Sequence, residues 1–176
     1  MTAFIALLSA AVLVVVDQLT KYLVVSNLAV SESVGVIDGI LRFTYVRNDG
    51  AVFGSLSGKA YIFNTATVLI VVVGIVLILM KKLKPKILLW AATLVIAGGI
   101  GNLIDRFRLK YVIDFIDVYC FGEYWKWVFN FADCCVVIGC CLMIVYCVMD
   151  IINDYKSKSK AAVIEENEDA SVDAEK

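Results

Sequence analysis

The chain has 176 residues, 61% of them apolar or aromatic, and a single proline, a composition that predicts a membrane protein rather than a soluble domain. The net charge of −1 and the lack of a basic block argue against nucleic acid as a partner, because phosphate binding depends on clustered Lys and Arg. No histidine is present, which excludes a Ser-His-Asp triad, a Cys-His pair and a His-ligated zinc site.

Four apolar stretches are long enough to cross a bilayer as helices, which takes about 20 residues each. The stretches cover about residues 3–25, 61–80, 87–104 and 131–150, within one membrane domain of residues 1–150. The first stretch lacks the basic N-terminal region of a signal peptide and is longer than its apolar part, so we expect it to be a membrane helix. The sequence therefore predicts an all-α membrane protein with a four-transmembrane-helix bundle.

The two longer connections, residues 26–60 and 105–130, fall on the same side of the membrane and can meet. The first mixes β-branched and aromatic residues with Asp-Gly turn signals at 38–39 and 49–50, which predicts a small β-rich surface domain. The second predicts an interfacial loop, because aromatic residues gather at membrane interfaces. These aromatic residues are Tyr119, Phe121, Tyr124, Trp125 and Trp127.

The charges outside the helices leave the orientation open. The connection "KKLKPK" has four lysines in six residues, and this density favours the cytoplasmic side for it and for both termini. A plain count of Lys and Arg is equal on the two sides. The segment from Ile151 ends in the acidic run "EENEDASVDAEK", which buries too little apolar surface to offset its ordering entropy, so we expect 151–176 to be a disordered cytoplasmic tail.

Two patterns have both a packing and a chemical interpretation. Five of the six cysteines lie in the fourth apolar stretch, where cysteine packs as a small hydrophobe. Without histidine a metal would need an all-thiolate cage, so we expect packing, with no metal and no organic cofactor. The glycines of "AGGIGNLIDR" at 97–106 lack the lysine and the strand of a phosphate-binding loop, and small residues in a membrane helix favour close helix packing.

Ionisable residues beside membrane segments are costly and normally have a partner or a function. Asp17 and Lys21, four residues apart, can form an ion pair on one helical face. Asn48, Asp49 and Gly50 fit a turn. They equally fit a site at which Asn48 or a neighbouring amide hydrogen-bonds an extended substrate.

Two further groups have an ordinary structural interpretation. Asn102 and Asp105, with Arg106 adjacent, fit a polar cluster that closes the third helix. Asn130 and Asp133 fit a helix N-cap followed by an acidic residue in the first turn of the fourth helix.

Asp114 is harder to explain, because in "YVIDFID" it lies among apolar residues, where an unpaired carboxylate is expensive and burial raises its pKa. If the loop 105–130 folds back over the helix ends, Asp114 and Asp133 can approach one another. Two close carboxylates in a poorly hydrated pocket tend to share a proton, as in aspartic proteases. One then takes a proton from water while the other donates to the scissile carbonyl oxygen, and the coupled pair gives no assignment of the two roles.

Two other aspartates and two other classes of function compete with this hypothesis. Asp105 precedes an arginine that would stabilise its charge, which suits an anchor better than a proton shuttle, and Asp117 lies one step beyond Asp114. A transporter component with a proton relay should place carboxylates near mid-membrane in several helices, whereas these gather at one face. A purely structural membrane protein would leave the cost of Asp114 and Asp133 unexplained.

Five motifs in order along the chain resemble the lipoprotein signal peptidases, also called type II signal peptidases. The motifs are "DQLTK" at 17–21, "RNDGAVFG" at 47–54, "GGIGNLIDR" at 98–106, "VIDFID" at 112–117 and "FNFAD" at 129–133. The resemblance implies an aspartic endopeptidase of the bacterial cytoplasmic (inner) membrane with an extracytoplasmic active site. It also implies a diacylglyceryl-modified prolipoprotein as substrate, cleaved just before the lipidated lipobox cysteine.

Carried over by motif, the implied catalytic pair is Asp114 and Asp133. Membrane lipid is an implied partner, and globomycin-type cyclic peptides are expected to occupy the pocket. Val52 stands where the family more often has alanine, and Lys110 where glycine is common, so these departures concern substrate preference. The implied substrate-binding or supporting residues are Asp17, Lys21, Asn48, Gly50, Asn102, Asp105, Arg106, Asn130 and Ala132.

Overall fold

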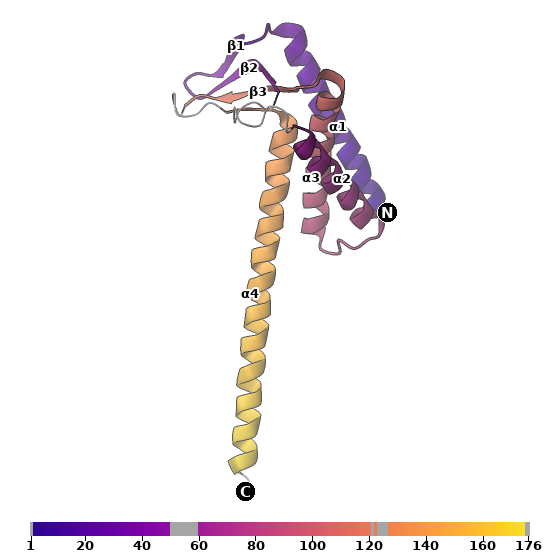
Figure 1. Ribbon diagram of the computed structural model, residues 1–176. Helices are drawn as coiled ribbons and strands as arrows, with labels where there is room; N and C mark the ends of the chain where they lie inside the picture. Colours follow the sequence, from indigo (N-terminus) through magenta and orange to yellow (C-terminus); the bar gives the residue numbers. More distant parts are fainter. Residues whose placement is uncertain (1, 50–59, 121, 123–126, 175–176) are drawn as a thin grey trace.

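The computed structural model describes residues 2–49, 60–120, 122 and 127–174 of the chain (Figure 1). Four helices run along one another, and a small sheet covers one end of them. In chain order the elements are α1 (Thr2–Asn27), β1 (Ser33–Ile37), β2 (Leu41–Asn48), α2 (Ala60–Leu79), α3 (Lys86–Leu109), β3 (Val112–Val118), β4 (Val128–Phe129) and α4 (Phe131–Ala174).

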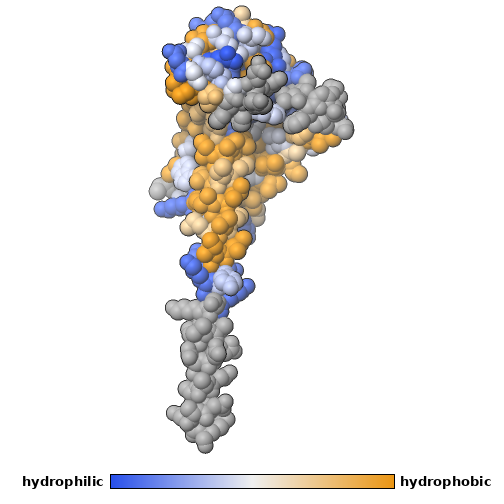
Figure 2. Space-filling model, turned by 90° about the vertical axis from the view of Figure 1, so that its left-hand side faces the viewer, coloured by the Kyte–Doolittle hydropathy of each residue, from blue (hydrophilic) through white to orange (hydrophobic). Residues whose placement is uncertain are grey.

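Each of the four helices contains a segment long and apolar enough to cross a membrane. Figure 2 shows an apolar band along the helices, between the more polar sheet end and the polar residues below the band. The side chains of Phe4, Leu69 and Ile144 are more than 60% exposed, as expected of residues that face lipid tails. The predicted four-helix membrane bundle with a small sheet is thus confirmed. The four segments are Thr2–Asn27, Tyr61–Leu79, Lys86–Leu109 and Phe131–Lys158.

Helix α3 extends beyond its predicted end at residue 104. No glycine or proline interrupts "DRFRL", and the helix stops where Lys110 adopts the left-handed conformation with φ 71°. Asp105 and Arg106 therefore project from the last turns of a rigid helix, as expected of a polar cluster that closes it, and the connection begins after Leu109 rather than at residue 105.

Helix α4 continues to Ala174, whereas the sequence predicts that it ends near residue 150 and that the tail 151–176 is disordered. Between Gly139 and Ala174 the chain contains no glycine and no proline, and Ala, Glu and Lys recur, all of which favour a helix. A polar composition is compatible with a solvated helix as well as with disorder. The helix therefore continues past residue 150 without a break.

The sheet joins the two connections that the sequence places on one side of the membrane. Its four strands are antiparallel in the order β1-β2-β3-β4. The predicted turn at 38–39 lies between β1 and β2, with Gly39 at φ 75°, while the turn at 49–50 extends outside the described residues. The predictions for Gly50, Val52, Phe121, Tyr124 and Trp125 also concern positions outside the described residues.

Strands β3 and β4 both lie in a segment predicted to be a loop, and β3, with the sequence "VIDFIDV", is the longer of the two. Its residues are nearly all buried, since β2 and β4 pair with it on its two edges. Ile113 and Phe115 pack with Tyr45 of β2 against Val24 in the last turns of α1. This apolar contact seats the sheet on the helix ends and brings Asp114 to the bundle.

The glycines of α3 allow close packing against three different helices, as predicted. A Cβ on Gly98 would collide with the backbone of Ala132 in α4. A Cβ on Gly99 would meet the side chain of Val71 in α2, and a Cβ on Gly101 would lie 2.5 Å from the carboxylate of Asp17 in α1. Helix α3 is therefore the centre of the bundle.

Candidate active site

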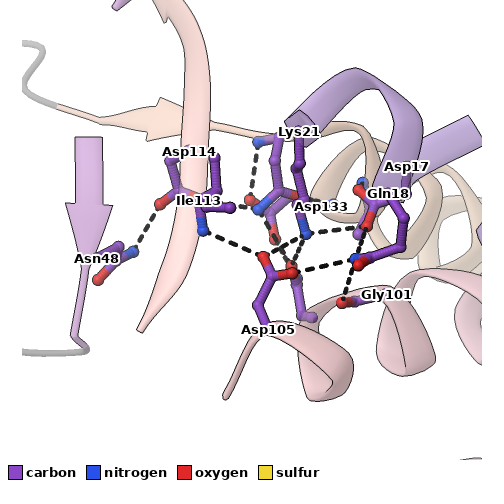
Figure 3. Close-up of polar contacts among 12 residues, drawn as sticks. Asp17, Gln18, Lys21, Asn48, Gly101, Asp105, Ile113, Asp114 and Asp133 are labelled. Carbon is purple, nitrogen blue, oxygen red and sulfur yellow. Dashed lines mark hydrogen bonds and ion pairs between the residues drawn. The ribbon is translucent and has the colours of Figure 1, made fainter. Parts of the chain in front are cut away.

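A polar network lies where the sheet meets the helix ends, and it draws residues from α1, β2, α3, β3 and α4 (Figure 3). It consists almost entirely of carboxylates and amides around one lysine. Burying so many polar groups is tolerable only because they satisfy one another.

Lys21 of α1 is the cation of this network and is 1% exposed. Its ammonium nitrogen Nζ lies 2.9 Å from Asp17 Oδ2 and 2.9 Å from Asp105 Oδ2, and it donates to Asn102 Oδ1 at 3.0 Å. An ammonium group has three hydrogens, so these three partners use all of its donors. The predicted ion pair between Asp17 and Lys21 is confirmed.

Asp105 is an anchor between three elements. Beyond Lys21 it accepts a hydrogen bond from the backbone N–H of Ile113 at 3.1 Å, on β3, and one from Gln18 Nε2 at 3.0 Å, on α1. Its ion pair is with Lys21 of a different helix and not with the adjacent Arg106 on which the sequence analysis relied.

Asn102 and Asn130 connect Lys21 by hydrogen bonds to the other two carboxylates, those of Asp114 and Asp133. Asn102 Oδ1 accepts from Lys21 and from Asn130 Nδ2 at 3.1 Å, which turns its own Nδ2 toward Asp133 Oδ1 at 2.7 Å. Because both acceptor positions of this oxygen are filled by donors, the orientation of the Asn102 amide is determined.

Asn130 and Asp133 form a reciprocal cap at the start of α4. Asp133 N donates to Asn130 Oδ1 at 2.9 Å, and Asn130 N donates to Asp133 Oδ2 at 3.1 Å. The predicted N-cap is therefore confirmed. Ala132, between them, donates its backbone N–H to Asp17 Oδ1 at 2.9 Å, so this helix N-terminus is held by a carboxylate from α1.

Asp114 of β3 is 2% exposed and is bound by two neutral amides. Asn130 Nδ2 donates to its Oδ1 at 2.6 Å, and Asn48 Nδ2 donates to its Oδ2 at 2.8 Å. Burial raises the pKa of Asp114 to about 6, and the charge of Asp133 adds to the rise, against the opposing effect of the two amides and of Lys21.

A β-bulge in β2 is the local reason that Asn48 reaches this carboxylate. Val46 lies opposite Asp114 across the ladder, and Asn48, two residues further, shares its face. The register shifts by one residue between Phe43 and Val46. Without that shift Asn48 would point to the other face of the sheet, because a slip of one residue reverses the face.

Asp117 is held apart from this group. Arg42 Nε donates to Asp117 Oδ2 at 2.6 Å, and Thr44 Oγ1 donates to the same oxygen at 2.9 Å. These contacts join β2 to β3 before the bulge, so the side chain of Asp117 is part of the sheet and not of the helix-end network.

The structure thus brings nine of the predicted site residues into one hydrogen-bonded network: Asp17, Lys21, Asn48, Asn102, Asp105, Asp114, Asn130, Ala132 and Asp133. Arg106 is next to the network on α3 and acts electrostatically on Asp133. Gly50 lies outside the described residues.

Gln18 is the residue that sequence reasoning misses. Its Nε2 lies within hydrogen-bond distance of Asp17 Oδ2 and of the backbone oxygen of Gly101, both at 3.2 Å, in addition to Asp105. The sequence does contain a signal for this residue, because an amide side chain in the middle of an apolar helix needs a hydrogen-bond partner just as the carboxylate of Asp17 does.

The cysteines of the chain are separate from the network. All six are free thiols, and four of them are exposed. Within the part of the chain that the structure describes, no group of three or more His, Cys, Asp or Glu side chains is placed to hold a metal ion. Their packing role stays a prediction.

Four membrane-spanning helices that end in a buried group of carboxylates and amides define a multi-pass membrane protein with acid-base groups suited to hydrolysis. The family model described as "Signal peptidase (SPase) II" matches residues 9–149, and the chain belongs to this family of proteases, which remove signal peptides from prolipoproteins.

Individual relatives are similar over most of their length. A lipoprotein signal peptidase of Syntrophus aciditrophicus is 37% identical over 158 residues, which cover 87% of this chain and 95% of that protein. One of Halothermothrix orenii is 42% identical over 136 residues, 77% of this chain and 89% of that protein. A solved bacterial membrane enzyme, determined by the in meso method at 1.9 Å resolution, superimposes with a TM-score of 0.75 at 35% identity, over 82% of this chain and 93% of that one.

Proposed function

We propose that the protein is an intramembrane aspartic endopeptidase in which Asp114 and Asp133 are the catalytic residues. It cleaves diacylglyceryl-modified prolipoproteins just before the lipidated cysteine. The observation that carries this proposal is that Asn130 contacts both carboxyl groups, by its side chain on Asp114 and by its backbone N–H on Asp133. Family membership supports the substrate class.

The chemistry needs one carboxyl group that is protonated and one that is charged. The charged group takes a proton from a water molecule, which attacks the scissile carbonyl carbon, while the protonated group donates to the carbonyl oxygen. The pKa of Asp114, raised to about 6, lets this group hold or release a proton near neutral pH. The two groups titrate as a pair, so the first proton to leave belongs to the pair rather than to one residue.

The amides hold the pair without supplying a cation. Asn48 and Asn130 orient the carboxyl group of Asp114, and Asn102 orients that of Asp133. A lysine or arginine in direct contact would stabilise the charged form of both groups and oppose proton transfer. A neutral amide donor orients the carboxyl group in the same way but stabilises its charged form less.

The proposal places the enzyme in the bacterial inner membrane, with the sheet and the active site near the extracytoplasmic face and membrane lipid around the helices. Three lysines between α2 and α3, and Lys86 at the start of α3, lie at the end opposite the sheet and support this orientation. A tag attached to the C-terminus should be protected from protease added to spheroplasts. Digestion of the tag in intact spheroplasts would reverse the orientation.

The decisive experiment measures cleavage of a diacylglyceryl-modified prolipoprotein by the purified protein and by three variants. We expect Asp114→Asn and Asp133→Asn to lose turnover while they remain folded, because Asn keeps the size of Asp but cannot exchange a proton. Asp105→Asn should keep part of the activity. An active Asp114→Asn beside an inactive, folded Asp105→Asn would move the catalytic role to Asp105.

Inhibition adds a second test of the same site. A globomycin-type cyclic peptide should compete with the lipidated substrate, raising its apparent KM at constant kcat. Inhibition that lowers kcat without a change in KM would place the inhibitor elsewhere.

A further inference from the structure

Helix α2 contributes no residue to the network described above, yet it carries a buried polar atom that no partner satisfies. The inward-facing positions of α2 recur every three or four residues, as expected for one helical face. Most of its other residues are exposed. These inward positions include Asn64, Thr67, Val71, Gly74 and Ile78.

Asn64 Oδ1 is buried and has no hydrogen-bond partner, alone among the buried side-chain nitrogen and oxygen atoms of the described residues. By contrast Thr67, one turn further along the same face, donates to the backbone oxygen of Phe63 at 2.8 Å. An unsatisfied acceptor lowers the stability of the fold, and polar residues at membrane depth are normally retained for a function.

The packing of α2 on α3 places Asn64 at the level of the active site. A Cβ on Gly74 would touch Ile96, and a Cβ on Gly99 would touch Val71. The two helices are antiparallel, so two turns from Val71 back to Asn64 correspond to two turns from Gly99 onward, to Arg106. Asn64 thus faces the end of α3 that holds the network.

We propose that Asn64 is a substrate-binding residue whose Oδ1 accepts a hydrogen bond from a backbone N–H of the extended substrate segment next to the scissile bond. This inference rests on the proposed function. An acceptor needs a donor, and a diacylglyceryl group offers ester carbonyls but no N–H or O–H. The peptide backbone of the substrate is therefore the part that can satisfy this atom.

The test combines enzyme variants with substrates that lack one N–H. Diacylglyceryl lipopeptides are prepared with single backbone amides replaced by esters, one position at a time around the scissile bond. They are cleaved by the wild type, by Asn64→Leu and by the control Thr67→Val, which changes the same helix face but removes only a bond within α2. Thermal unfolding of each variant is measured in parallel.

In the wild type, the ester at one position should raise KM roughly 3- to 10-fold, the loss expected for one hydrogen bond, with little change in kcat. Asn64→Leu should show the same rise with the all-amide substrate and no further rise with that ester. Thr67→Val should keep the wild-type profile. The unfolding midpoint of Asn64→Leu should equal or exceed that of the wild type, because the variant removes an unsatisfied acceptor.

Three results would overturn the assignment of Asn64. One is an unchanged KM in Asn64→Leu. Another is an ester profile that is the same in both enzymes, which would mean that Asn64 receives no hydrogen bond from the substrate backbone. The third is a lowered unfolding midpoint, which would indicate a structural role. Failure of the wild type to cleave the all-amide lipopeptide would instead contradict the proposed function itself.

Discussion

Two groups of buried aspartates lie side by side in this protein and are bound in opposite ways. Asp17 and Asp105 both contact the ammonium of Lys21, while Asp114 is bound by neutral amides alone among its side-chain donors. All of these carboxylates are at most 2% exposed. Burial is therefore the same for the ion-paired aspartates and for the proposed catalytic Asp114, and the charge of the partner is what distinguishes them.

The largest effect on activity should come from Asp114 and from Asp133, whose carboxylate also accepts from an amide, that of Asn102. We expect Asp114→Asn and Asp133→Asn to lower kcat by about 10²- to 10⁴-fold or more, the contribution of a positioned acid or base. Single-turnover cleavage of the lipidated substrate measures this, and Asp117→Asn, which changes a carboxylate outside the network, is the matched control. A comparable loss in Asp117→Asn would erase the distinction between the groups.

The largest effect on stability should come from the cation-bound group. Lys21→Met leaves the carboxylates of Asp17 and Asp105 buried without their cation, which costs about 3–5 kcal/mol. Denaturant unfolding in detergent measures the loss. Combining Lys21→Met with Asp17→Asn and Asp105→Asn should recover part of it, since no uncompensated charge is then left. A triple variant no more stable than Lys21→Met would argue against charge as the cause.

The pH dependence of stability should distinguish Asp114 from an ion-paired aspartate. Its pKa is raised from 3.8 to about 6, so the protonated form is favoured in the folded protein. Below about pH 4 the carboxyl is protonated in both states. Between about pH 4 and 6 the unfolded chain releases its proton first, so stability falls by up to about 3 kcal/mol and stays lower above pH 6.

Asp114→Asn removes this titration. The unfolding midpoint of the variant should exceed that of the wild type at pH 8, and the difference should shrink toward pH 4.5. A midpoint difference that is the same at both pH values would mean that Asp114 is not the group responsible.

A smaller effect should follow from crowding the ion-paired group. Gly101→Ala would place a Cβ 2.5 Å from Asp17 Oδ2, and either the carboxylate or helix α3 must move. Such overpacking typically costs about 1–3 kcal/mol. Denaturant unfolding of Gly101→Ala checks this. Gly39→Ala, at a turn with open space around the glycine, separates local backbone strain from crowding. Equal losses in both variants would contradict the steric explanation.

The sequence predicts the contacts that depend on spacing within one helix. The pair Asp17 and Lys21 follows from four-residue spacing, and the cap formed by Asn130 and Asp133 follows from three-residue spacing. Apolar length alone predicts the four helices, because the bilayer sets that length.

Contacts between distant segments were not predictable in this way. Lys21 contacts Asp105 because α1 packs on α3 across the glycine at 101. No local sequence pattern shows which face of α3 packs on α1. Likewise Asn48 reaches Asp114 through a bulge in β2, in a sheet whose central strand the sequence does not reveal. The resemblance to a family supplied these residues, but it gave neither their partners nor Gln18.

The smallest effect should come from the ion pair at the surface of the sheet. The side chain of Arg42 is 42% exposed, so solvent screens its contact with Asp117 despite the 2.6 Å separation. We expect Arg42→Gln to lower stability by roughly 0–1 kcal/mol and to leave kcat nearly unchanged, because exposed pairs contribute little. Denaturant unfolding at low and at high salt measures this, and the small loss should vanish at high salt. A loss of stability as large as that of Lys21→Met would contradict this. It would show that the exposed pair in the sheet contributes as much to stability as the buried pairs at the helix ends, so that solvent exposure does not set the strength of the ion pairs in this protein.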